Sequence, residues 1–187
     1  TGERLVLNFI QHLSGIATKT RMLSQQIEGY PAALLDTRKT TPGLRVLEKW
    51  AVGLGGAVNH RLGLFDMIML KDNHIDNAGG MNKGIQAVKD YLKAHDLSIP
   101  IVIEARSLGE VSAIIQHEGI KRILLDNMSP ETMKEAISLI NGQMQTEASG
   151  GVDADNLRRI AETGVDYIST SELTRGITPL DVSLKID

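Results

Sequence analysis

Basic side chains in the first half of the chain have the types and spacing of an anion-binding pocket. An arginine fork matches carboxylate and phosphate oxygens, and a lysine adds a compact positive charge. If these side chains converge, they would bind a ligand with more than one negative charge. The alternative is a solvated basic pair, with Arg61 closing an ion pair with Asp66. The set consists of Arg38, Lys39, His60, Arg61 and Lys71.

Three acidic residues follow or end later apolar runs: Glu104, Asp126 and Glu147. Carboxylates at such positions either bind a hard cation or accept hydrogen bonds from sugar hydroxyls. Mg²⁺ commonly takes one or two carboxylates together with substrate phosphate oxygens, which suits acidic residues beside an anion pocket. The alternative is that Glu104 or Asp126 neutralises Lys71, and both arrangements can hold in one site.

Small and hydroxylated residues stand near the end of the chain, at Ser149-Gly150-Gly151 and at Thr170-Ser171. Glycines at a strand-to-helix turn let backbone N–H groups approach a phosphate, and a following helix N-terminus adds partial positive charge. Barrel phosphate sites often use the loops after the last strands. We therefore predict phosphate binding here, against the plainer interpretation of a common glycine-rich turn.

All of these residues lie at or near the ends of predicted strands, which alternate with stretches of helical spacing. This alternation indicates parallel strands joined by crossover helices, with all carboxyl ends on one side. We favour a barrel over an open sheet because charged residues end nearly every strand. The seven predicted strands are residues 32–36, 66–71, 100–104, 122–126, 145–148, 166–170 and 181–186. The predicted helices are residues 4–28, 41–54, 82–94, 108–117, 130–140 and 154–163, and residues 72–80 form a predicted polar loop.

The composition indicates one globular domain over residues 1–187. A net charge of −3 gives no general attraction to nucleic acid or to an anionic membrane, so anion binding must be local. With no cysteine, disulfides and thiolate metal sites are excluded. No apolar stretch reaches the roughly 20 residues that a membrane span needs. We expect a cytoplasmic protein.

Other kinds of site fit the sequence less well. His12, His95 and His117 fall on predicted helices and are expected at the surface or in packing, and no spacing indicates zinc. A hydrolase triad lacks a nucleophile elbow. A Schiff-base lyase would use Lys71 or Lys185, which would have to be desolvated. A non-catalytic binding module is a further alternative.

Several long segments match the motifs of one known family. They are Asp36-Thr37-Arg38-Lys39-Thr40-Thr41-Pro42-Gly43-Leu44-Arg45, Asn59-His60-Arg61-Leu62-Gly63-Leu64-Phe65-Asp66, Met69-Leu70-Lys71-Asp72-Asn73-His74, Leu125-Asp126-Asn127-Met128 and Glu147-Ala148-Ser149-Gly150-Gly151. On these residues the chain resembles quinolinate phosphoribosyltransferase, also called nicotinate-nucleotide pyrophosphorylase (carboxylating). The match covers nearly the whole chain.

The resemblance implies transfer of phosphoribosyl from phosphoribosyl pyrophosphate to quinolinate, with decarboxylation. The products would be nicotinate mononucleotide, pyrophosphate and CO₂ in NAD biosynthesis, with Mg²⁺ as cofactor. It also implies an incomplete α/β barrel of about seven strands, preceded in the family by an N-terminal sandwich domain. Residues 1–187 would then be a fragment lacking that domain. The expected assembly is a homodimer or higher homo-oligomer, and a paralogue acting on another pyridine-like acceptor remains an alternative.

By the same resemblance, the quinolinate carboxylates would be held by Arg38, His60, Arg61 and Lys71. Lys39 and Lys71 would face phosphates. Glu104 and Asp126 would face the ribose hydroxyls and the metal. The catalytic residues would be Lys71, Glu104 and Asp126. The 5′-phosphate would be bound by Ser149, Gly150, Gly151, Thr170 and Ser171.

The sequence departs from the family pattern near its end. Ser171-Glu172 and Arg175-Gly176 stand where the family usually has small residues and His-Ser. A carboxylate beside a phosphate would be unfavourable, so the resemblance requires Glu172 to point away from the site.

Overall fold

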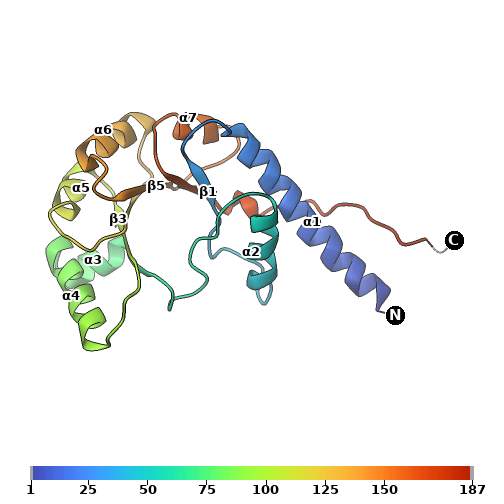
Figure 1. Cartoon of the computed structure of the whole chain (residues 1–187), viewed down its shortest axis with the longest axis horizontal. Helices are drawn as coiled ribbons and strands as arrows, with labels where there is room; N and C mark the ends of the chain where they lie inside the picture. The colour runs from blue at the N-terminus through green and yellow to red at the C-terminus, as the bar shows by residue number, and fades with distance from the viewer. Residues whose placement is uncertain (1, 186–187) are drawn as a thin grey trace.

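Helices and strands alternate along the chain and build an incomplete parallel α/β barrel (Figure 1). The computed structural model describes residues 2–185. Its elements are α1 (Glu3–Gln26), β1 (Ala33–Leu35), α2 (Arg45–Leu54), β2 (Ile68–Leu70), α3 (Asp72–Ala78), α4 (Met81–Ala94), β3 (Ile101–Ala105), α5 (Leu108–Ile114), β4 (Arg122–Asp126), α6 (Pro130–Ile140), β5 (Gln145–Ser149), α7 (Leu157–Ala161), β6 (Tyr167–Ser169) and a 3₁₀ turn, η1 (Ser171–Leu173).

The strands are all parallel and lie in the order β1-β6-β5-β4-β3-β2. β1 and β2 stand at the two ends of this order, so the ring of strands is not closed. In Figure 1 the helices lie outside the curved sheet, with α1 and α2 on one arm and α3 and α4 on the other. This confirms the predicted parallel barrel, with six strands rather than the seven expected within the described part of the chain.

The predicted seventh strand, residues 181–186, was wrong as far as the structure describes it. Residues 181–185 form no strand, and residue 186 lies outside the described residues. The segment instead lies along α1, where Leu180 N donates to Gln11 O and Gln11 Nε2 donates to Val182 O, both at 3.1 Å. Gly15 permits this approach, because a side chain there would collide with the backbone of Thr178. The alternating apolar residues were therefore not a sign of sheet pairing.

The predicted polar loop at 72–80 was also wrong, because most of it forms α3. Its start is held by the His74 ring, whose Nδ1 accepts a hydrogen bond from Lys71 N at 3.1 Å. Gly79 ends the helix in the left-handed conformation, with φ of 81°. A seven-residue helix with few apolar residues carries too weak a periodicity to be recognised from sequence.

Residues alternate between the two faces of the sheet and so separate the core from the site. Ile103, Ile123, Leu125, Ala148 and Ile168 belong to the buried hydrophobic core, which the helices cover. The residues one position along, including Glu104, Leu124, Asp126, Glu147 and Ser169, turn inward. Because side chains along a strand alternate with a period of two, the same short strands supply both the apolar core and the polar interior.

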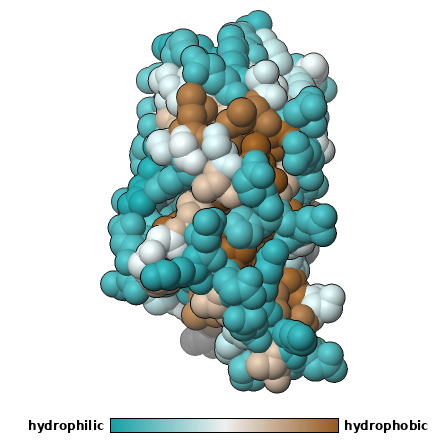
Figure 2. All heavy atoms as spheres, turned by 90° about the vertical axis from the view of Figure 1, so that its left-hand side faces the viewer, coloured by the Kyte–Doolittle hydropathy of each residue, from teal (hydrophilic) through white to brown (hydrophobic). Residues whose placement is uncertain are grey.

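The outer surface is unevenly hydrophobic. Over the arm that carries α4 and α5, it is mostly hydrophilic with smaller apolar patches (Figure 2). On α2 and the loop that follows it, large apolar side chains are exposed, among them Trp50 at 58% and Phe65 at 71%. Among residues 2–185, no helix combines the length and hydrophobicity that a membrane span requires.

Candidate active site

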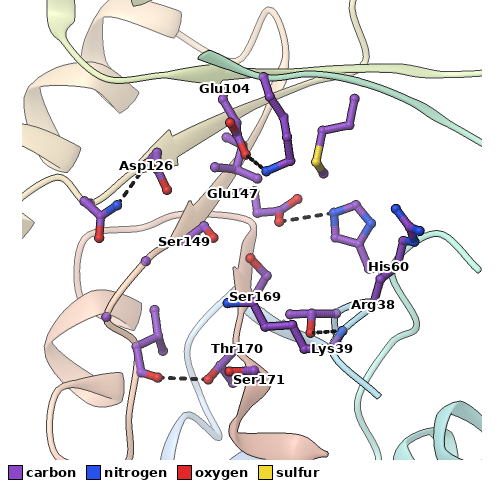
Figure 3. A pocket seen from close by; sticks show the side chains of 18 of the residues that line it. Arg38, Lys39, His60, Glu104, Asp126, Glu147, Ser149, Ser169, Thr170 and Ser171 are labelled. Carbon is purple, nitrogen blue, oxygen red and sulfur yellow. Dashed lines mark hydrogen bonds and ion pairs between the residues drawn. The ribbon is translucent and has the colours of Figure 1, made fainter. Parts of the chain in front are cut away.

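A cavity of about 670 Å³ opens at the carboxyl ends of the strands (Figure 3). It brings together every site residue predicted from the sequence, from the first strand to the last. What each residue binds stays a prediction. The predicted residues that line the cavity are Arg38, Lys39, His60, Arg61, Lys71, Glu104, Asp126, Ser149, Gly150, Gly151, Thr170 and Ser171.

One wall of the cavity is cationic. Arg38 and Lys39 follow β1, and within residues 2–185 neither side chain has an ion-pair partner. Arg61 donates from its guanidinium to Met67 O at 3.0 Å. Burial, together with the charge of Arg38, lowers the pKa of Arg61 from its ordinary value. An incoming anion would relieve this unfavourable concentration of positive charge.

The alternative pairing of Arg61 with Asp66 does not form as an ion pair. The Asp66 carboxylate instead accepts from Leu62 N at 2.7 Å and from Gly63 N at 3.0 Å. Burial would raise the pKa of Asp66, but these backbone donors outweigh it and hold the pKa below its ordinary value. Asp66 therefore shapes the loop after Arg61 and leaves the guanidinium in the cavity wall.

The opposite wall carries carboxylates. Glu104 Oε1 lies 2.6 Å from Lys71 Nζ, so the predicted pairing of Glu104 with Lys71 is confirmed. Asp126 Oδ2 accepts from the Asn127 amide at 2.9 Å, which leaves its other oxygen free of hydrogen bonds from residues 2–185. The Lys71 side chain is 44% exposed, which is not the desolvated environment that a Schiff-base lysine needs. Lys185 is exposed outside the cavity.

Glu147 lies deeper than the sequence predicted. We expected it at a strand end, but β5 runs on to Ser149, and Glu147 is fully buried in the middle of the strand. Its Oε2 accepts from Arg122 Nη1 at 2.8 Å, and its Oε1 lies 3.3 Å from His60 Nε2. Burial would raise the pKa of Glu147, but His60 and Arg122 together hold it below its ordinary value. Glu147 is therefore an ionised group beneath the cavity.

The glycine-rich turn lines the far end of the cavity. Gly150 and Gly151 have φ of 89° and 60°, and a side chain at Gly150 would collide with Asn127. The Thr170 hydroxyl donates to Val152 O at 2.9 Å, which ties the turn after β6 to the turn after β5. The expected helix N-terminus is not adjacent, since α7 begins only at Leu157. Any phosphate site here would depend on backbone N–H groups and hydroxyls.

Glu172 points away from the cavity, as the family resemblance requires. Its Oε2 accepts from Lys19 Nζ of α1 at 2.8 Å. The same lysine donates to Arg175 O at 3.2 Å. Arg175 lines the cavity at the end where the glycine-rich turn lies. The departure from the family pattern thus adds a cation to this end instead of an anion.

The three histidines that we expected at the surface or in packing lie outside the cavity, as predicted. His12 Nε2 lies 2.9 Å from Oε1 of the buried Glu48. The His95 ring contacts Tyr91 O, and the His117 ring contacts the side-chain amide of Asn82. In residues 2–185, no group of three or more histidine, cysteine or acidic residues is arranged to hold a metal ion.

Sequence reasoning missed a buried layer beneath the cavity. Arg122 pairs with Glu147, and Lys49 pairs with Asp36 at 2.5 Å. The signal for Arg122 was present, because it stands two and four residues before Leu124 and Asp126 on one strand and so shares their face. No comparable signal marks Lys49, which reaches Asp36 from a helix.

Comparison with known proteins identifies the family of the chain. Residues 16–185 match the family model of quinolinate phosphoribosyl transferase, C-terminal domain. A mitochondrial quinolinate phosphoribosyltransferase [decarboxylating] from Nicotiana tabacum is 46% identical over 99% of this chain and 56% of its own length. A probable nicotinate-nucleotide pyrophosphorylase [carboxylating] from Synechocystis is 49% identical over the whole chain and 63% of its own length.

The fold agrees as well. The crystal structure of NadC from Streptococcus pyogenes matches 99% of this chain and 64% of its own, with a TM-score of 0.93 and 41% identity. The chain thus spans little more than half of the tobacco relative and under two thirds of the other two. From the matched segments and the shared fold, the chain belongs to the quinolinate phosphoribosyltransferase family, whose C-terminal domain it matches.

Proposed function

We propose that this chain is the catalytic domain of an enzyme that transfers phosphoribosyl from phosphoribosyl pyrophosphate to quinolinate. The products are nicotinate mononucleotide, pyrophosphate and CO₂, in NAD biosynthesis. The observation that carries the proposal is one cavity with carboxylates on one wall, a glycine-rich turn at its end and, on the other wall, the cations Arg38 and Lys39, which have no ion-pair partner among residues 2–185. A dicarboxylate, a ribose and a phosphate require such an arrangement. The printed names of the relatives support the same reaction.

In this proposal, Arg38, Arg61 and Lys71 bind the two carboxylates of quinolinate. Arginine forks can accept carboxylates in a bidentate manner, which would hold the pyridine ring in a fixed orientation. Lys39 faces phosphate oxygens, and Ser149 to Gly151 with Thr170 and Ser171 bind the 5′-phosphate through N–H and O–H donors.

The bond from the ribose C1 to the pyrophosphate oxygen breaks as the pyridine nitrogen forms its bond to C1. Positive charge that develops on the ribose is stabilised by the carboxylates of Glu104 and Asp126. The ring nitrogen is then cationic, so the neighbouring carboxylate leaves as CO₂ and its electron pair remains on the ring carbon. That carbon takes up a proton to give the product. No protein nucleophile is needed.

Glu104 and Asp126 also suit Mg²⁺, because both offer hard oxygen donors beside the predicted pyrophosphate position. Two carboxylates leave most of the coordination sphere to phosphate oxygens and water, as is usual for Mg²⁺. When bound, Mg²⁺ would neutralise the departing pyrophosphate. Removing the ion with a chelator should abolish turnover, and adding Mg²⁺ back should restore it.

We propose a homodimer or higher homo-oligomer for the whole protein, which in the family also carries an N-terminal sandwich domain. The exposed apolar residues Trp50 and Phe65 support this, since exposed apolar patches commonly mark protein interfaces. Light scattering on the full-length protein tests it. Trp50→Glu should give a smaller species, and a monomeric parent protein would contradict the proposal.

The cytoplasm remains our proposed location. The absence of cysteine is compatible with it, but the tobacco relative is named for mitochondria. Imaging of the tagged full-length protein in its own cells decides between the two.

Calorimetric titration with quinolinate tests the substrate assignment. Nicotinate, which has one carboxylate fewer, serves as the matched ligand. Quinolinate should bind at least tenfold more tightly, and Arg38→Ala should remove most of the difference. Equal affinity for the two ligands in the full-length protein would contradict a dicarboxylate site.

A further inference from the structure

A buried ion pair lies beneath the cavity, where the barrel interior would ordinarily be apolar. Arg122 Nη1 donates to Glu147 Oε2 at 2.8 Å, and both side chains are at least nine-tenths buried. The Arg122 guanidinium also lies 3.8 Å from the centre of the Tyr167 ring. Burying a charge pair is weak evidence for stability, because desolvation offsets most of the attraction. The pair therefore calls for another explanation.

The second oxygen of Glu147 indicates what the pair does. Glu147 Oε1 lies 3.3 Å from His60 Nε2, and the dashed line between the two side chains in Figure 3 marks this contact. The contact is not aligned as a hydrogen bond, and within residues 2–185 neither atom has another partner. A buried carboxylate oxygen thus faces a buried imidazole nitrogen.

The other ring nitrogen of His60 fixes the position of the proton. His60 Nδ1 accepts a hydrogen bond from Arg61 N at 2.7 Å. An imidazole nitrogen that accepts a hydrogen bond carries no proton, so the proton must be on Nε2. A ring with its only proton on Nε2 carries no charge.

A second buried pair holds the backbone of the same residue. Asp36 Oδ1 accepts from His60 N at 2.7 Å and from Lys49 Nζ at 2.5 Å. Lys49 Nζ in turn donates to His60 O at 2.9 Å. The Asp36–Lys49 ion pair thus hydrogen-bonds both the N–H and the C=O group of His60. The Glu147–Arg122 ion pair faces the His60 ring.

We propose that Glu147, oriented by Arg122, is a positioning residue that keeps His60 as a neutral ring with its proton on Nε2. Asp36 and Lys49 hold the His60 backbone in place. The His60 ring, which lines the cavity, is thereby held in one orientation, and the positive charge of the site comes from the arginines and lysines. The effect of this orientation on quinolinate binding rests on the proposed function, and the position of the proton does not.

Nitrogen NMR of protein labelled with ¹⁵N-histidine tests the proposal in the absence of substrate. The His60 signals are assigned as those that disappear in His60→Gln. They should show a protonated Nε2 and an unprotonated Nδ1 at neutral pH. An imidazolium pattern, or a proton on Nδ1, would overturn the proposal whether or not the protein has transferase activity.

Glu147→Gln tests the role of the carboxylate. In this variant, Arg122 would still donate a hydrogen bond to the side-chain oxygen. The amide NH₂ would then face the N–H at His60 Nε2, so that two hydrogen-bond donors would face each other. The Nε2–H signal should weaken or move to Nδ1, with unchanged far-UV circular dichroism. Glu118→Gln, at an exposed carboxylate outside the cavity, is the matched control. An unchanged His60 pattern in folded Glu147→Gln would rule out Glu147 as the positioning residue.

If the protein is active, Glu147→Gln should raise KM for quinolinate by on the order of tenfold or more. The fall in kcat should be smaller than this rise in KM. An inactive parent protein would count against the proposed function alone, since the NMR pattern still decides the positioning role.

Discussion

Lys71 Nζ and Glu104 Oε1 lie 2.6 Å apart across the mouth of the cavity and neutralise each other. The lysine side chain is 44% exposed, so this ion pair contributes little to stability. Glu104 lies on β3, and Lys71 directly follows the neighbouring β2. In the proposed reaction, each would exchange the other for a charged part of a substrate.

Substituting either partner of this pair should therefore affect catalysis and leave stability nearly unchanged. Glu104→Gln keeps the shape but removes the charge that would stabilise the developing positive ribose, so kcat should fall by roughly 10² or more. The melting temperature should move by only a few degrees. Steady-state kinetics and thermal unfolding on one preparation check both statements, and a large loss of stability with normal kcat would contradict them.

The buried Glu147 should make stability depend on acidic pH. Its pKa is lowered in the folded protein, so its ionised form stabilises the fold above its ordinary value of 4.5, and that contribution is lost as pH falls through the folded-state pKa. Urea unfolding between pH 7 and 3 should give a falling free energy of unfolding. In Glu147→Gln the fall should be shallower, and an identical slope would contradict the assignment.

Gly150 should tolerate no side chain. Its φ of 89° costs an alanine about 1–2 kcal/mol, and the added Cβ would also collide with Asn127. Gly119→Ala is the matched control, since its φ is 79° but nothing lies within 4 Å of the added atom. Gly150→Ala should be the less stable of the two and should bind phosphoribosyl pyrophosphate more weakly. Equal free energies of unfolding for the two variants in urea would contradict the claim that a side chain at Gly150 collides with Asn127.

Arg175 and Glu172 should behave differently although only three positions separate them. Arg175 lines the cavity, so Arg175→Ala should raise KM for phosphoribosyl pyrophosphate several-fold through loss of a phosphate-facing charge. Glu172→Ala removes a partly exposed ion pair with Lys19 and should change KM by less than about twofold. Equal effects of both substitutions would mean that the turn, and not the charge, matters.

The sequence predicted the barrel and the cavity residues because both follow from short-range patterns. Strands with polar carboxyl ends must converge in a parallel barrel, and this brought Arg38 and Asp126 into one site. The deeper layer depends on long-range contacts, such as that of Lys49 with Asp36, which no local spacing encodes. The strand predicted around Val182 did not form for a related reason. A segment with alternating apolar residues pairs with a sheet only when a neighbouring strand is available.

Formation of nicotinate mononucleotide by the full-length protein tests the central claim most directly. With quinolinate, phosphoribosyl pyrophosphate and Mg²⁺, the parent protein should release product and CO₂ in equal amounts. Arg38→Ala should reduce the rate by at least 10² with an unchanged circular dichroism spectrum. Full activity in Arg38→Ala, or no product from the folded parent protein, would contradict the account.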